Sequence, residues 1–130
     1  LFLIYFVLKD IKSIFFDLVK SKLNITFANE QEFFALIGAN NFKDVIEFAK
    51  KIKKLIVITR GKNGAVAIQD DQVIECKAKN NLKIKDLTGA GDLFAAGFLH
   101  GYVNKLSLEE SLKKGTELSS KVIQQVGARL

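Results

Sequence analysis

The residues best suited to chemistry form the segment Asp86-Leu87-Thr88-Gly89-Ala90-Gly91-Asp92, which lies between an extended stretch and an apolar helix. The first turn of a helix presents backbone N–H groups without partners and a partial positive charge, so an anion can bind there. Because Gly89, Ala90 and Gly91 have no bulky side chains, phosphate oxygens can approach those amides closely. The carboxylate of Asp92 would repel phosphate, and it is better suited to accept a proton from an incoming hydroxyl group. The segment therefore indicates an anion site with a general base beside it.

The same segment also has a purely structural explanation. A Gly-Ala-Gly sequence can be no more than a turn, and an aspartate in the first turn of a helix stabilises the positive end of the helix dipole. Taken in isolation, residues 86–92 leave both interpretations open.

Two further segments carry polar residues and glycines at fixed spacing. Asn29 and Glu32 form an N-x-x-E pattern, which on its own is that of a helix N-cap and its capping partner three residues later. Thr59-Arg60-Gly61-Lys62-Asn63-Gly64 follows an apolar run in the pattern T-x-G-x-x-G. Its glycines are suited to a ligand loop and equally to a tight turn.

The elements that must position these segments alternate between strands and helices. Strands are expected at 1–8, 25–28, 55–59 and near 83–86, helices at 10–23, 30–37, 42–54, 93–103 and 107–125, and a hairpin at 65–69 and 72–76. Alternating strands and helices predict an α/β fold with a mostly parallel sheet, into which the hairpin places an antiparallel insert. Ser107 and Glu110 have the spacing of a capping box at the start of the last helix, and Gly127 is its expected terminator.

Length and composition indicate one globular domain. A chain of 130 residues suits one core, and 48% hydrophobic with 26% charged residues is an ordinary globular balance. Cys76 is the only cysteine, so an internal disulfide is impossible and a reducing, cytoplasmic setting is expected. The apolar run at residues 1–8 is far shorter than the ~20 residues of a membrane-spanning helix, so no membrane partner is expected.

The chain has a net charge of +6, and its lysines are densest at Lys50, Lys51, Lys53 and Lys54. These residues suit the negative end of a predicted helix, and they also suit a patch that binds a phosphate backbone. Because the sequence shows no aromatic platform for stacking bases, we favour the solvated helix end over a nucleic-acid partner.

Residues 86–92, continued by Leu93-Phe94-Ala95-Ala96-Gly97-Phe98, resemble the C-terminal motif D-x-T-G-A-G-D of the ribokinase-type (PfkB) sugar and nucleoside kinases. The resemblance implies that Asp92 is the catalytic base. It implies that Gly89, Ala90 and Gly91 supply the anion hole. Thr88, in the same motif, is expected among the residues that bind ATP.

The resemblance extends to the two other segments, which follow in the family's order. By resemblance, Asn29 and Glu32 help to organise magnesium and phosphate, partly through water. Thr59, Gly61 and Gly64 match the strand-end motif that contacts the nucleotide. The implied ligands are therefore ATP, as substrate, and Mg²⁺.

The whole resemblance is strong over residues 25–130, and the ending Gly127-Ala128-Arg129 is similar to that of adenosine kinase-like members. It implies a ribokinase-like three-layer α/β/α fold whose N-terminal half, with the acceptor-binding residues, is missing from residues 1–130. The implied reaction is transfer of the γ-phosphoryl group of ATP to a hydroxymethyl group of a sugar or nucleoside. The alternative is a catalytically silent remnant or an ATP-binding module. A partner chain or self-association covering the missing half is expected with either.

Overall fold

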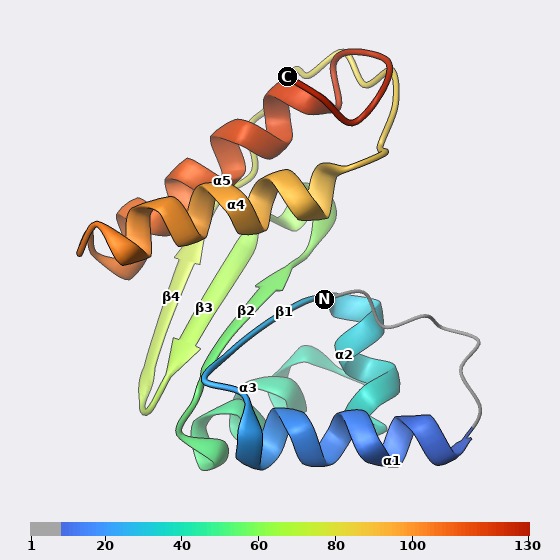
Figure 1. Ribbon diagram of the computed structural model, residues 1–130, viewed down its shortest axis with the longest axis vertical. Helices are drawn as coiled ribbons and strands as arrows, with labels where there is room; N and C mark the ends of the chain where they lie inside the picture. Colours follow the sequence, from blue (N-terminus) through green and yellow to red (C-terminus); the bar gives the residue numbers. More distant parts are fainter. Residues whose placement is uncertain (1–8) are drawn as a thin grey trace. The chain divides into compact units, whose positions relative to one another are not determined.

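The chain has an α/β fold, and the structure, a computed structural model, describes residues 9–130 (Figure 1). The strand expected at residues 1–8 lies outside the described residues. The helices are α1 (Lys9–Asp17), which continues into a π-helical turn (Leu18–Lys22), α2 (Glu30–Ile37), α3 (Phe42–Ile52), a 3-10 turn (Gly61–Asn63), α4 (Ala90–Val103) and α5 (Leu108–Val122). The strands are β1 (Ile25–Asn29), β2 (Leu55–Thr59), β3 (Ala65–Gln69) and β4 (Gln72–Cys76).

The four strands form one mixed sheet in the order β1-β2-β3-β4. β1 and β2 are parallel, in a register that runs from Ile25 opposite Leu55 to Asn29 opposite Thr59. β3 and β4 are neighbours joined by Asp70 and Asp71 alone, a connection short enough only for an antiparallel pair. The expected α/β fold with an antiparallel hairpin is therefore confirmed, and the sheet, expected to be mostly parallel, is mixed, with β1 and β2 as a parallel pair.

The chain divides into two compact units. The first comprises the described residues up to Thr59 together with Ala67–Val73, and the second comprises Arg60–Val66 and Ile74–Leu130. That they form one domain stays a prediction.

The first unit is built around β2, whose residues Leu55 to Ile58 are all at most 1% exposed. A strand that is apolar at every position suits a parallel pair covered on both faces, as the continuous run in the sequence indicated. Beside it, the ring of Phe48 on α3 lies 5.6 Å from that of Phe16 and 6.1 Å from that of Phe33. Phe33 is buried and the other two rings are half-buried, and packing between the three rings fixes α1, α2 and α3 to each other.

The second unit is built on close packing between α4 and α5, which lie side by side (Figure 1). Where they meet, a Cβ atom on Gly97 would lie 2.6 Å from the carbonyl oxygen of Lys114, and one on Gly115 would lie 2.7 Å from that of Phe94. Phe98 and Leu112 are completely buried in the same unit. Glycine is therefore required at 97 and 115 so that the two helix backbones can approach each other.

Two differences from the elements expected from the sequence affect the candidate site. Residues 83–86 form no strand, because the amides of Lys85 and Asp86 donate to the carbonyl oxygen of Ile123, at 2.8 and 3.2 Å, instead of to a strand. Helix α4 begins at Ala90, three residues earlier than expected, which places Asp92 at its third position. The small residues of the motif are thus the first turn of the helix and not a loop before it.

No helix in residues 9–130 combines the length and the apolar character needed to cross a membrane.

We predict that Gly97→Ala and Gly115→Ala each lower the free energy of unfolding by about 1–3 kcal/mol, because the added methyl group overlaps backbone atoms of the facing helix. An exposed helical glycine would behave in the opposite way, since alanine has the higher helix propensity. Urea unfolding followed by circular dichroism measures the change. Ala96→Ser, which adds one atom at an exposed position of α4, is the control, and equal effects at 96 and 97 would contradict the prediction.

Candidate functional site

In the first unit, the strand register places two predicted site residues side by side. Asn29 ends β1 and Thr59 ends β2, and they are direct partners in the parallel pair. Ligands of α/β proteins bind beyond the carboxyl ends of such strands. The geometry therefore brings together a residue expected to act on metal and phosphate and one expected to contact the nucleotide.

Asn29 and Glu32 form a complete capping box at the start of α2. The Asn29 side chain accepts a hydrogen bond from the Glu32 amide at 2.8 Å, and Oε2 of Glu32 accepts one from the Asn29 amide at 2.8 Å. The structural role expected from the spacing alone is therefore confirmed. The box uses one oxygen of each side chain, so Oε1 of Glu32 and the exposed Nδ2 end of Asn29 are left over.

These two residues fit a metal only if most of its ligands come from elsewhere. Residues 9–130 contain no group of three or more His, Cys, Asp or Glu side chains placed to hold a metal ion. Magnesium usually keeps several water molecules and takes one or two carboxylates together with substrate phosphates. One free carboxylate oxygen and a neighbouring amide suit that mode of binding, partly through water.

The turn after β2 contains two glycines with different requirements. Both have positive φ, 54° at Gly61 and 90° at Gly64. A Cβ atom on Gly64 would lie 2.0 Å from the carbonyl oxygen of Cys76, whereas one on Gly61 would meet nothing within 4 Å. Gly64 is therefore explained by packing within the second unit, and the exposed Gly61 has open space beside it for a ligand.

In the second unit, α4 begins without a capping side chain. Its N-cap is Gly89, at φ 79°, whereas α2, α3 and α5 are capped by the side chains of Asn29, Asn41 and Ser107. The amide of Ala90 donates to the carbonyl oxygen of Leu87 at 3.2 Å, and the first intrahelical bond runs from the Leu93 amide to Gly89 at 2.9 Å.

The first turn of α4 therefore retains free donors. Among the described residues, no hydrogen bond uses the amides of Gly89, Gly91 or Asp92. Of the three residues expected to form an anion hole, Gly89 and Gly91 thus have free N–H groups, and that of Ala90 is already weakly engaged. The Asp92 amide, which the sequence did not single out, is a third free donor, because an amide at the third helical position has no intrahelical partner.

The Asp92 side chain is exposed, on the first turn of α4. It is neither buried nor hydrogen bonded to another described residue, so its carboxylate is accessible to a ligand. A carboxylate in this position next to free amides combines a proton acceptor with an anion site.

Asp86 and Thr88 form the start of the motif and bind each other. The Thr88 amide donates to Oδ1 of Asp86 at 2.9 Å, and Oδ2 accepts from the amide of Gly127 at 3.0 Å. The Thr88 hydroxyl, the Thr88 amide and the Gly127 amide hold the pKa of Asp86 below its ordinary value of 3.8. Asp86 is thus an ionised residue whose oxygens are directed at protein donors.

Residues after α5 lie directly behind the motif, a contact that the sequence did not reveal. Besides the bond to Gly127, a Cβ atom on Gly89 would lie 2.7 Å from that of Ala128, so the backbone at Gly89 lies against Ala128. The motif and the tail are 41 residues apart at the Asp86–Gly127 bond. The Gly-Ala-Arg ending was the one available signal, and it came from resemblance alone.

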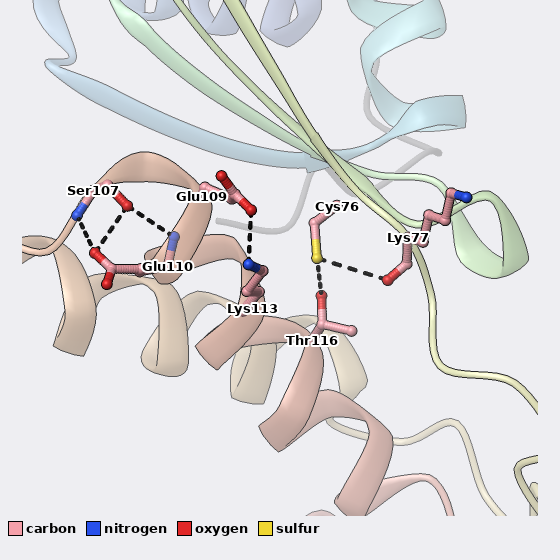
Figure 2. A network of polar contacts seen from close by, with 7 residues as sticks. All are labelled: Cys76, Lys77, Ser107, Glu109, Glu110, Lys113 and Thr116. Atoms are coloured by element: carbon pink, nitrogen blue, oxygen red, sulfur yellow. Dashed lines mark hydrogen bonds and ion pairs between the residues drawn. The ribbon is translucent and has the colours of Figure 1, made fainter.

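Figure 2 shows a polar network where β4 ends beside α5. Sγ of Cys76 lies 3.6 Å from the carbonyl oxygen of Lys77 and 3.7 Å from Oγ1 of Thr116. One turn earlier on α5, Lys113 binds Glu109 at 2.7 Å, and this hydrogen bond raises the pKa of Lys113. The contact between Cys76 and Thr116 attaches the end of β4 to the helix, and the carbonyl oxygen of Cys76 is the one that packs on Gly64.

Comparison with known proteins gives matches along nearly the whole chain. A model of the pfkB family of carbohydrate kinases matches residues 9–130. A cytidine kinase from Thermococcus kodakarensis is 38% identical over 112 residues, which are 84% of this chain and 40% of that protein. A nucleoside kinase from Methanocaldococcus jannaschii is 34% identical over 106 residues, 82% of this chain and 34% of that protein.

Solved structures give the same result. The adenosine kinase from Sinorhizobium meliloti is 38% identical and superposes with a TM-score of 0.87 over 92% of this chain, which is 37% of its own. The chain therefore spans well under half of the length of each of these relatives.

We predict that Gly64→Ala destabilises the protein far more than Gly61→Ala. Both substitutions place a side chain at positive φ, which costs about 1–2 kcal/mol, but only at Gly64 would the new methyl group collide with backbone. We expect a loss of about 3 kcal/mol or more for Gly64→Ala and about 1 kcal/mol for Gly61→Ala, measured by urea unfolding. Equal losses would show that the approach of the Cys76 carbonyl is not what requires glycine.

We also predict that Asp86→Asn changes the acid end of the stability profile. A lowered pKa in the folded state means that Asp86 stabilises the protein fully above about pH 3.8, and that this contribution is lost as the pH falls through the folded-state value. The difference in unfolding free energy between wild type and variant should therefore be largest near neutral pH and shrink below about pH 3.8.

Urea unfolding at a series of pH values measures this difference. Glu110 and Glu117, whose pKa values are also lowered, are present in both proteins, so their effects cancel. A difference in unfolding free energy between wild type and Asp86→Asn that stays constant down to pH 2 would contradict a lowered pKa of Asp86 in the folded state.

Proposed function

The chain belongs to the pfkB family of carbohydrate kinases, and from this premise we propose that it is the nucleotide-binding and catalytic part of a kinase. The reaction is transfer of the γ-phosphoryl group of ATP to a hydroxymethyl group of a nucleoside or sugar. The observation that carries this proposal is the uncapped first turn of α4, where free amides adjoin the exposed carboxylate of Asp92.

Asp92 acts in this proposal as the general base. Its carboxylate accepts the proton of the acceptor hydroxyl group as the oxygen attacks the γ-phosphorus. A general base in this role accelerates a reaction by about 100- to 10,000-fold. The exposure of Asp92 supports the assignment, because a base must reach the substrate's proton.

The free amides of Gly89, Gly91 and Asp92 stabilise negative charge on the transferring phosphoryl group. The Ala90 amide joins them if phosphate replaces the carbonyl of Leu87, to which it makes a bond of 3.2 Å. Donors that are fixed before the reaction lose little free energy through reorganisation, which is why such sites contribute strongly to catalysis. As the acceptor oxygen forms its bond to the γ-phosphorus, the bond between the γ-phosphorus and ADP breaks, and ADP departs as an anion.

In the first unit, Thr59 contacts the nucleotide, and Asn29 and Glu32 act on a magnesium ion partly through water. The place of Asn29 and Thr59 at the carboxyl ends of two parallel strands supports this role, and so does the unused Oε1 of Glu32. In the second unit, Gly61 contacts the nucleotide, and the open space beside it supports this role. When bound, the magnesium ion supplies positive charge that neutralises phosphate oxygens. Gly64 serves here as a packing residue of the turn, and Thr88 holds the motif through Asp86.

A nucleoside is the favoured acceptor. The relatives that are 34–38% identical include a cytidine kinase, a nucleoside kinase and an adenosine kinase. Within the described residues, however, no group is identified that would bind a base or a ribose. A reducing, cytoplasmic setting is part of the same proposal and rests on the single free cysteine.

A second candidate, an ATP-binding module without acceptor turnover, is favoured by one observation. The chain covers only 34–40% of the curated nucleoside kinases reported above. A segment of this size that contains the uncapped first turn of α4 would bind ATP, and it would transfer a phosphoryl group only together with a region that binds the acceptor.

We predict that Asp92→Asn abolishes acceptor-dependent ADP formation and leaves ATP binding within about threefold, because asparagine keeps the shape of the side chain but cannot take up the hydroxyl proton. The assay measures ADP release from Mg-ATP in the presence of a panel of nucleosides and sugars. Calorimetric titration measures ATP binding in parallel.

Asp71→Asn, on the exposed hairpin turn, is the matched control and should resemble wild type in both assays. Turnover by Asp92→Asn at the wild-type rate would refute the role of Asp92. Binding of ATP by wild type without turnover would favour the ATP-binding module, and the absence of both would refute nucleotide binding by this chain.

A further inference from the structure

Asp86 is the one carboxylate of the motif that the proposed reaction leaves without a role. Its two oxygens bind different parts of the chain, since Oδ1 accepts from the Thr88 amide and Oδ2 from the Gly127 amide. A residue that served only a local turn would need the first bond alone. The second bond reaches 41 residues along the chain, so Asp86 connects the motif to the tail after α5.

Three further contacts join the same two segments. The amides of Lys85 and Asp86 both donate to the carbonyl oxygen of Ile123, at 2.8 and 3.2 Å. The backbone at Gly89 packs so closely on Ala128 that a Cβ atom there would lie 2.7 Å from the Ala128 Cβ. We call residues 123–128 the C-terminal brace.

The contacts lie immediately before the free amides of α4. Gly89, which touches Ala128, is itself the N-cap, and its carbonyl accepts the first bond of the helix from Leu93. The direction of the Gly89, Gly91 and Asp92 amides therefore depends on the backbone that Asp86 and the brace hold. Because α4 has no capping side chain of its own, this support comes from outside the helix.

The electrostatic arrangement also fits a supporting role. A carboxylate so near an anion site would weaken phosphate binding if its charge faced the ligand. Here the oxygens of Asp86 are occupied by the Thr88 and Gly127 donors, so the charge is partly neutralised by protein groups.

We propose that Asp86 is a positioning residue, which acts through the C-terminal brace to fix the phosphate-binding amides at the start of α4. The inference rests on the proposed function for the role of those amides. The coupling between the motif and the brace does not depend on it.

The test is a double-mutant cycle on phosphate binding. Asp86→Asn leaves one acceptor oxygen for the two amides of Thr88 and Gly127 and removes the negative charge, so it weakens the link to the brace. A chain ending at Gln125 removes Val126–Leu130 and therefore both Gly127 and Ala128. Calorimetric dissociation constants are measured for wild type, both single variants and the double variant, with ATP, tripolyphosphate and adenosine as probes.

Each single variant should weaken the binding of ATP and tripolyphosphate about tenfold, as expected for loss of one hydrogen bond to a charged group. Adenosine binding should stay unchanged, because a nucleoside lacks the phosphates that the amides bind. The double variant should be no weaker than the weaker single variant, since both changes act on the same connection between the motif and the brace. Additive losses, or an equal loss for adenosine, would overturn the proposal by showing independent effects or general loosening.

A second measurement needs no ligand and separates this inference from the proposed function. Amide hydrogen exchange by NMR follows Ala90 and Leu93, whose amides are hydrogen bonded at the start of α4. Both should exchange faster in Asp86→Asn and in the shortened chain than in wild type and in the Asp71→Asn control. Unchanged exchange would overturn the coupling. Faster exchange in a chain that binds neither ATP nor tripolyphosphate would confirm the coupling and refute nucleotide binding.

Discussion

The phosphate-binding turn of the second unit depends on one constraint, a helix that begins without a capping side chain. At the start of α2, α3 and α5 a side chain accepts from a first-turn amide, but Gly89 has no side chain to do so at the start of α4. A capping side chain stabilises a helix by roughly a few tenths of a kcal/mol relative to glycine. Without one, the first-turn amides can be satisfied only by water or a ligand. A cap would occupy the donors that an anion needs. The lower intrinsic stability of this helix start and its capacity to bind an anion therefore have the same cause.

Such a helix start has to be held by parts of the chain outside its first turn. Gly97 and Gly115 let the backbones of α4 and α5 approach closely, which fixes the body of α4. Asp86 and Ala128 support the turn before it. In both places the close approach excludes larger side chains, so packing at a distance from the first turn determines where the free amides point. Because this packing holds the helix from outside its first turn, the first turn can contain the small or exposed residues Ala90, Gly91 and Asp92.

Local signals in the sequence predicted much of this structure, and contacts between distant residues account for what it missed. The capping boxes at Asn29 and Ser107 follow from spacing because both partners lie within one turn. The buried strand β2 follows from its unbroken apolar run. The strand expected at 83–86 was wrong, because the carbonyl of Ile123, 37 or more residues away, takes the hydrogen bonds that a strand would need. The earlier start of α4 was missed for a related reason, since Gly89, just before the first helical residue, lies against the distant Ala128.

The capping box at Asn29 shows why a structural and a functional explanation of one motif need not compete. The box requires one oxygen from each side chain, Oδ1 of Asn29 and Oε2 of Glu32, and each accepts an amide at 2.8 Å. These bonds fix the rotamers of both residues and so hold Oε1 of Glu32 at a defined place beside the end of β1. Pairing of Asn29 with Thr59 then brings the cap to the end of β2. A ligand group held in this way loses little conformational entropy on binding, so the cap would itself preorganise the metal-binding residues.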